Sequence, residues 1–184
     1  MDTLRQQLTL FDGKRTDVLE RIAASIADDP HATGRLATIA EESPGDAIAV
    51  AATWVILALL KARPGAGVDR SVAVRLVRVL ERARPWETRL HVLQALARME
   101  PARVLTPAKL RSLASVLLAN AQDPKPFVRA WSLNLLGLIG GTLPADHQAQ
   151  VSRLIAEAEA GEAASIKARL RQLRAAGGLA WLTA

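Results

Sequence analysis

Residues 123–137 read DPKPFVRAWSLNLLG, and this stretch decides the fold class. Its arginine, Arg129, has counterparts 40 residues away on either side, at Arg89 and Arg169. Self-similarity at one fixed period of this length is typical of proteins that stack short helical repeats. A single helix pair cannot bury its apolar face alone, so neighbouring pairs must cover one another.

The residues around each arginine are also similar. They read WETRLHVLQAL at 86–96 and IKARLRQL at 166–173. A fourth copy, GDAIAVAATWVIL at 45–57, precedes them and has Ala49 at the arginine position. The apolar residues of these copies recur at helical spacing, which favours helices over strands. Proteins of this kind present a surface to a partner, so the sequence says more about architecture than about chemistry.

We therefore expect an all-α fold, since helix formers dominate and hairpin signals between alternating apolar runs are absent. Two leading helices are predicted at 3–10 and 15–27. Four helix pairs follow, at 32–42 with 46–63, 69–82 with 86–99, 107–121 with 125–139, and 146–159 with 163–176. The chain length suits one domain, with cap helices in 1–30, repeats in 31–176 and a capping tail in 177–184.

Glycine and proline support these boundaries. Capping side chains precede a proline at 43–44, 106–107 and 123–124, where a missing N–H is tolerated at a helix start. The stretch 63–67 is the clearest loop. Gly140–Gly141 and Gly177–Gly178 are predicted to end helices in the left-handed conformation. The tail beyond them carries apolar side chains and is predicted to fold back over the last apolar face.

Composition narrows the classes of function. The chain of 184 residues has no cysteine, which excludes disulfides, thiolate metal sites and cysteine nucleophiles. Aromatic residues make up 3% and tyrosine is absent, which is low for a small-molecule pocket or a base-stacking surface. The net charge of +6 is typical of proteins with polyanionic partners, but an arginine-rich composition from a GC-rich genome is the favoured explanation.

The positive charge is uneven along the chain. Residues 61–111 hold twelve basic and four acidic side chains. Within the predicted helix 69–82, Arg75, Arg78 and Arg82 share one face at positions i, i+3 and i+7. This basic stripe is a candidate phosphate-binding surface, and the alternative is a solvated outer face.

Paired helices at this period, with Asp-Pro before the second helix and Val-Arg inside it, resemble the HEAT repeat. The likeness covers roughly 31–176 and is best at 123–137; the position of Asp123 is Ser43, Ala83 or Ala163 in the other copies. The resemblance implies a right-handed α–α solenoid of about four helix pairs with an N-terminal capping helix. It also implies that the second helix of each pair lines the concave face.

The three repeated arginines allow two interpretations. Arg89, Arg129 and Arg169 would form a row of cations about 10 Å apart, able to follow phosphates or an acidic helix. Alternatively, as HEAT-like arrays imply, each bonds helix-terminal carbonyls or a neighbouring aspartate. The second interpretation is favoured, most strongly for Arg129 because Asp123 is near in sequence.

The leading hypothesis is a non-enzymatic scaffold that binds a protein partner through a basic concave face. Trp86 is the expected apolar contact because Trp and Arg dominate interface energetics. The sequence carries no nucleotide-binding, zinc-protease or hydrolase motif, and its histidines lack ligand partners at i+3 or i+4. We expect no cofactor, no metal and no catalytic residue. The candidate partner-binding residues are Arg84, Trp86, Arg89, His91, Arg98 and Arg129.

The alternative is a nucleic-acid-binding protein. HEAT-like proteins include alkylpurine DNA glycosylases, which this chain resembles in its helical repeats, positive charge and tryptophans. They are longer and use a groove aspartate, whereas Asp46 and Asp123 here are expected caps. The start of the chain lacks signal-peptide features, and the uncharged run between Asp46 and Lys61 is too short for a membrane span. A cytoplasmic location without membrane contact is expected.

Overall fold

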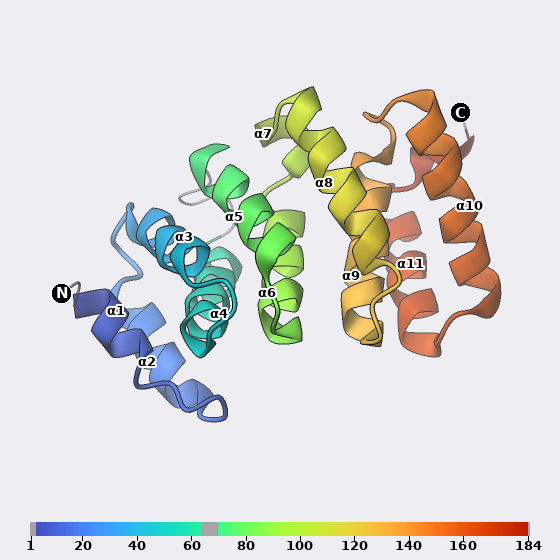
Figure 1. Ribbon diagram of the computed structural model, residues 1–184. Coiled ribbons are helices and arrows are strands. Elements are labelled where there is room, and N and C mark those ends of the chain that lie inside the picture. The colour runs from blue at the N-terminus through green and yellow to red at the C-terminus, as the bar shows by residue number, and fades with distance from the viewer. Residues whose placement is uncertain (1–2, 64–69, 184) are drawn as a thin grey trace. The chain divides into compact units, whose positions relative to one another are not determined.

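The computed structural model describes residues 3–63 and 70–183, and within them it contains helices and no strand (Figure 1). The prediction of an all-helical chain is confirmed. None of the helices in these two stretches combines the length and apolar character needed to cross a bilayer. The α-helices are α1 (Thr3–Leu8), α2 (Thr16–Ser25), α3 (Ala32–Glu42), α4 (Ala47–Ala62), α5 (Arg70–Arg82), α6 (Trp86–Arg98), α7 (Pro101–Val104), α8 (Pro107–Asn120), α9 (Pro126–Gly140), α10 (Ala145–Gly161) and α11 (Ala164–Ala175), and a 3₁₀ turn, η1, covers Ala180–Thr183.

The chain divides into two compact units, Met1–Met99 and Glu100–Ala184. In the first unit α3 packs beside α5, while α4 packs beside α6 and α2. The two helices of each pair also contact one another, α3 with α4 and α5 with α6. These contacts are compatible with consecutive helix pairs that pack against one another. The prediction of a single domain stays a prediction.

The helix α4 is central to the first unit because it is apolar on all sides. Its sequence, AIAVAATWVILALLKA, carries one charge, Lys61, in the last turn. Such a helix must be covered from several directions, and α4 contacts α1, α2, α3 and α6. Ile56 is fully buried at its centre, against a core that includes Leu36 and Leu93 from other helices of the unit.

The helix α5 is amphipathic instead. Val72, Leu76 and Val79 are buried on one side, while arginines occupy the opposite side. The predicted start of this helix at Asp69 and the predicted loop at 64–67 lie outside the described residues. The described part begins at Arg70.

The second unit is organised around α9, which contacts α8, α10 and α11. Proline at the first position of α9, Pro126, starts the helix without loss of a hydrogen bond. The side chain of Asp123 accepts from the backbone N–H of Lys125 at 2.8 Å and fixes the turn before it. A short helix, α7, was not among the expected elements; it follows Glu100, whose φ of 48° lies in the left-handed region.

The glycines at the end of α9 have a different role from the predicted one. Gly177 does adopt the left-handed conformation, with φ of 79°, but Gly141 has φ of −64° and continues in helical geometry. The prediction of a left-handed conformation at Gly141 is therefore wrong. Gly140 is required by close packing, since a Cβ there would overlap the ring of Trp181. That indole donates its N–H to the carbonyl of Gly137 at 2.8 Å, so the tail lies against α9.

Candidate functional site

Two of the three repeated arginines bind the chain that leads into their own helix. Arg89 Nη1 donates to the carbonyl oxygens of residues 83 and 84, at 3.2 and 2.8 Å. Arg129 Nη1 donates to those of residues 123 and 124, at 2.9 and 3.4 Å. The acceptors stand six and five residues before the arginine in both cases. Equivalent repeat positions thus make equivalent contacts, which supports the structural interpretation of these residues.

Arg129 also makes a two-pronged ion pair with Glu162, which precedes α11. Its Nε and Nη2 donate to the two carboxylate oxygens, each at 2.9 Å. The side chains are 19% and 28% exposed, so water screens the pair incompletely. The hydrogen bonds from Arg129 lower the pKa of Glu162, and the same contact raises the pKa of Arg129. This arginine is committed to joining α9 to the start of α11.

The basic stripe on α5 converges on one carboxylate of α3. Arg75 Nη1 and Arg78 Nη1 lie 2.7 and 3.2 Å from the carboxylate oxygens of Glu41. Arg82 donates to the backbone carbonyl of Glu41 at 2.9 Å. Burial raises the pKa of Glu41, but the hydrogen bonds from the first two arginines outweigh burial and lower it. The predicted phosphate-binding residues therefore join α5 to α3, and three positive charges share one negative charge.

His91 lies between α6 and α4. Its Nδ1 is 3.3 Å from the hydroxyl oxygen of Thr53, and that hydroxyl donates to the carbonyl of Ala49 at 2.7 Å. The pKa of His91 is lowered to about 4, chiefly by burial. The charge of Lys61 adds to this lowering, and a hydrogen bond with the backbone of Val50 opposes it. The imidazole is neutral at physiological pH and packs against α4.

The remaining predicted contacts lie at the two ends of α6. Arg84 precedes the helix and Arg98 ends it, and both are exposed. Trp86 is half-buried in the first turn and already has an interaction partner. Of the predicted partner-binding residues, the two exposed arginines are thus the ones with side chains presented to solvent.

A surface that the residue-by-residue prediction missed runs along α9. Phe127 is 57% exposed and Leu138 is 36% exposed, and Trp131 is half-buried between them. These residues stand at positions i, i+4 and i+11, so they share one face of the helix. We call these three residues the α9 stripe. Large apolar side chains exposed in a row are typical of interaction surfaces.

The third repeated arginine, Arg169, belongs to this surface. Its guanidinium lies over the ring of Trp131, with Cζ 4.0 Å from the ring centre. Burial lowers the pKa of Arg169. Among the described residues it contacts no carboxylate, in contrast to Arg129 and Arg174, which bind Glu162 and Glu159. The three repeated arginines thus serve two different purposes.

The repeat itself carries the signal by which the stripe could be found. Forty residues before the stripe, the equivalent positions on α6 are Glu87, His91 and Arg98. A position that is polar in one repeat and large and apolar in the next is poorly explained by a shared core. The structure places Trp131 half-buried beneath a guanidinium.

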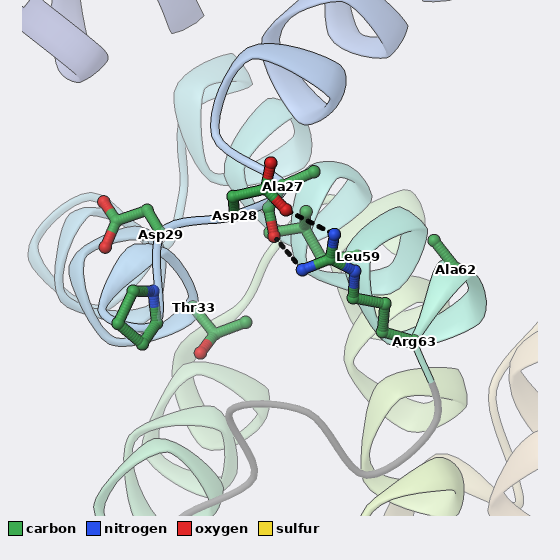
Figure 2. A pocket seen from close by; sticks show the side chains of 8 residues that line it. Ala27, Asp28, Asp29, Thr33, Leu59, Ala62 and Arg63 are labelled. Atoms are coloured by element: carbon green, nitrogen blue, oxygen red, sulfur yellow. Dashed lines mark hydrogen bonds and ion pairs between the residues drawn. The ribbon is translucent and has the colours of Figure 1, made fainter.

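The described residues contain no group of three or more His, Cys, Asp and Glu side chains that could bind a metal ion. The adjacent pair Asp28 and Asp29 borders a pocket of about 180 Å³ between the end of α2 and the end of α4 (Figure 2). Figure 2 shows Arg63 bound to Asp28 and to the carbonyl of Ala27. Asp29 pairs with Arg35, whose side chain that figure does not show. Each carboxylate has its own arginine, so the two do not share a proton. The pocket is smaller than the roughly 300 Å³ at which ligand sites usually begin.

Comparison with known proteins gave no match: the chain matches no protein-family model, no curated protein and no solved structure. The function proposed below therefore rests on the geometry of the two units alone. Two surfaces of the described residues have properties of a binding site, the α9 stripe with Arg169 and the α5 arginines around Glu41.

Proposed function

We propose that the chain is a non-enzymatic module of HEAT-like repeats that binds a protein partner. In this proposal the helix pairs are successive turns of a right-handed solenoid. The protein is located in the cytoplasm. The single observation that carries it is the α9 stripe, whose apolar side chains stay exposed although α9 is the central helix of its unit. Aromatic residues and arginine together are the groups that contribute most to protein interfaces.

The repeated contact of Arg89 and Arg129 supports the HEAT-like part of the proposal. The same side chain bonds the same two carbonyl positions in both units, which is expected where one structural unit is repeated. Positions that hold the fold are constant between repeats, and positions on the surface are free to differ. The stripe belongs to the second kind.

Selection from a peptide library tests the proposal. Random peptides displayed on phage are selected on the full chain and then counter-selected on a Phe127→Ser variant. We expect enriched peptides that bind the original chain and lose affinity when Phe127 is replaced. Failure to enrich any peptide dependent on Phe127 or Leu138 would refute protein binding through this surface.

Nucleic acid is the second candidate, and the α5 arginines favour it. Arg75, Arg78 and Arg82 have side chains 39%, 48% and 51% exposed, and together they exceed the charge of Glu41. The excess is available to phosphates of a backbone. Binding of labelled duplex and single-stranded DNA, followed by fluorescence anisotropy at about 50 and 200 mM salt, checks this candidate. Affinity that falls steeply with salt and weakens in Arg78→Gln would support it, and absence of binding at the lower salt would exclude it.

A further inference from the structure

The surface around the α9 stripe combines apolar and basic character. The two helices that form it, α9 and α11, carry five basic residues and no acidic residue in their sequences PFVRAWSLNLLGLIG and ASIKARLRQLRA. The helices α9 and α11 pack side by side. Arg129 and Arg174 are paired with Glu162 and Glu159, so the charge that a ligand meets beside the apolar side chains comes from the other basic residues of α11, among them Arg169.

Arg169 lies against the centre of the stripe, over the ring of Trp131. It is half-buried, it is fixed over Trp131, and it contacts no carboxylate among the described residues. A partly desolvated guanidinium without a counter-ion is costly, because it loses hydration and gains no charge partner. An acidic group supplied by a ligand would remove that cost. The burial that lowers the pKa of Arg169 is consistent with this incomplete solvation.

Asn134 lies on the same face of α9, between Trp131 and Leu138. It is 6% exposed. A side-chain amide can both donate and accept, so it can bond a polar atom that approaches the stripe from outside. The face thus offers apolar area, one amide and one guanidinium within a few turns of helix.

The stripe also sets the length and shape of its ligand. Phe127 and Leu138 are eleven positions apart along α9, which corresponds to about 16 Å at 1.5 Å per residue. Three turns of a second helix cover the same distance and repeat apolar residues at the same spacing. Helices that dock on apolar helix surfaces use residues at i, i+3 or i+4 and i+7 in this manner.

We propose that the face formed by the α9 stripe, Asn134 and Arg169 binds an amphipathic helix of a partner protein that places an acidic side chain against Arg169. The inference rests on the proposed protein-binding function and specifies the partner. Apolar residues of the partner helix cover Phe127 and Leu138, and its carboxylate pairs with the guanidinium that is fixed on Trp131.

Two synthetic helical peptides test the inference on the full chain. One carries leucine at i, i+4, i+7 and i+11 with glutamate on both flanks, and the other replaces every glutamate by glutamine. Binding is measured by isothermal titration calorimetry and by anisotropy of a peptide-attached dye. We expect the glutamate peptide to bind about tenfold more tightly than the glutamine peptide, as for a charge-assisted pair shielded from water.

Matched variants assign the effect to the face. Arg169→Gln is compared with Arg153→Gln, which removes one exposed charge from α10, and Phe127→Ser with Leu10→Ser, which removes an exposed apolar side chain from the other unit. We expect Arg169→Gln to weaken the glutamate peptide about fivefold or more and to abolish the preference over glutamine, with each control within about twofold. Unchanged urea midpoints show that the variants are folded.

The outcomes separate the inference from the proposed function. Equal binding of both peptides, lost in Phe127→Ser, would overturn the acidic partner and leave a protein-binding stripe. A glutamate preference that persists in Arg169→Gln would overturn the assigned charge partner. Binding of DNA alone, or a dimer of the chain that Phe127→Ser dissociates, would overturn the helix as the occupant. Absence of any peptide binding here, together with failure of the library selection, would overturn both.

Discussion

Replacement of Arg129 by methionine separates a structural role from a binding role. Methionine keeps much of the length of the side chain but removes the five N–H donors. The variant loses the ion pair with Glu162 and the hydrogen bonds to the carbonyls of residues 123 and 124. If these contacts hold the end of one repeat to the start of the next, the free energy of unfolding must fall.

The geometry sets the expected magnitude. Hydrogen bonds to charged groups contribute about 1.5–3 kcal/mol where they are buried, and exposed ion pairs contribute about 0.2–1 kcal/mol. Arg129 and Glu162 are 19% and 28% exposed, so their coupling should lie between these ranges, at about 1–2 kcal/mol. The carbonyl bonds bring the total for Arg129→Met to about 2–3 kcal/mol. A drop of that size corresponds to a melting temperature lower by roughly 5–10 °C for a chain of this length.

The assay is urea denaturation of a double-mutant cycle, Arg129→Met, Glu162→Gln and the double variant, followed by circular dichroism. The pKa of Glu162 is lowered in the folded state, so the unfolded state binds more protons as the pH falls. The coupling is therefore fully present above about pH 4.5 and disappears as acid protonates the folded carboxylate. It should be largest near neutral pH and decline as the pH falls through the lowered pKa of the folded carboxylate.

The arginine-to-lysine change adds a control for charge. Arg129→Lys keeps the charge but cannot make the two-pronged contact, so its stability should lie closer to that of Arg129→Met than to that of the original chain. Free energies of Arg129→Met and the original chain that agree within about 0.5 kcal/mol would refute the structural role. Arg129 would then be a residue that contacts a ligand.

Three further changes test other parts of the structure. Gly140→Ala should lower the free energy of unfolding by about 2–4 kcal/mol, measured in urea, because its methyl group displaces the ring of Trp181 and its hydrogen bond. Glu41→Gln should cost about 1–2 kcal/mol by the same assay, since the three α5 arginines lose their shared carboxylate. The pKa of His91 is lowered to about 4, so the free energy of unfolding should rise by about 2–4 kcal/mol between about pH 4 and 6.5. This rise should be absent in His91→Gln, and NMR titration of the imidazole checks the pKa.

Periodicity carried the prediction of helices because it depends on many residues at once. The apolar run of α4 and the Asp-Pro before α9 identified their helices without any knowledge of contacts. The same reasoning could not foresee that Gly140 serves the indole of Trp181, because that requirement depends on a residue 41 positions later that the tail brings back. At Gly177 the left-handed conformation depends on the local helix end alone, and there the prediction is correct.

The candidate site was harder to predict for a related reason. The α5 arginines formed a basic stripe in the sequence, but the partner that organises them, Glu41, lies 34 residues before Arg75 on another helix. Charge counted along a chain does not distinguish arginines bound to carboxylates from those left available. Arg169 is the opposite case. Its position in the repeat predicted a bond to helix-terminal carbonyls or an aspartate, and the structure places its guanidinium over the ring of Trp131 instead.

Comparison of the repeats with one another explains why the surface differs while the fold is maintained. At the position of Arg89 and Arg129 the side chain is bound to its own backbone, so replacement changes stability and the residue stays the same in both repeats. Two residues later, the side chains are His91 and Trp131, one neutral against α4 and the other beneath Arg169. The second position therefore carries a different contact in each repeat, whereas the first carries the same one. A difference of this kind between repeats marks where recognition can be placed, and the α9 stripe contains such a position.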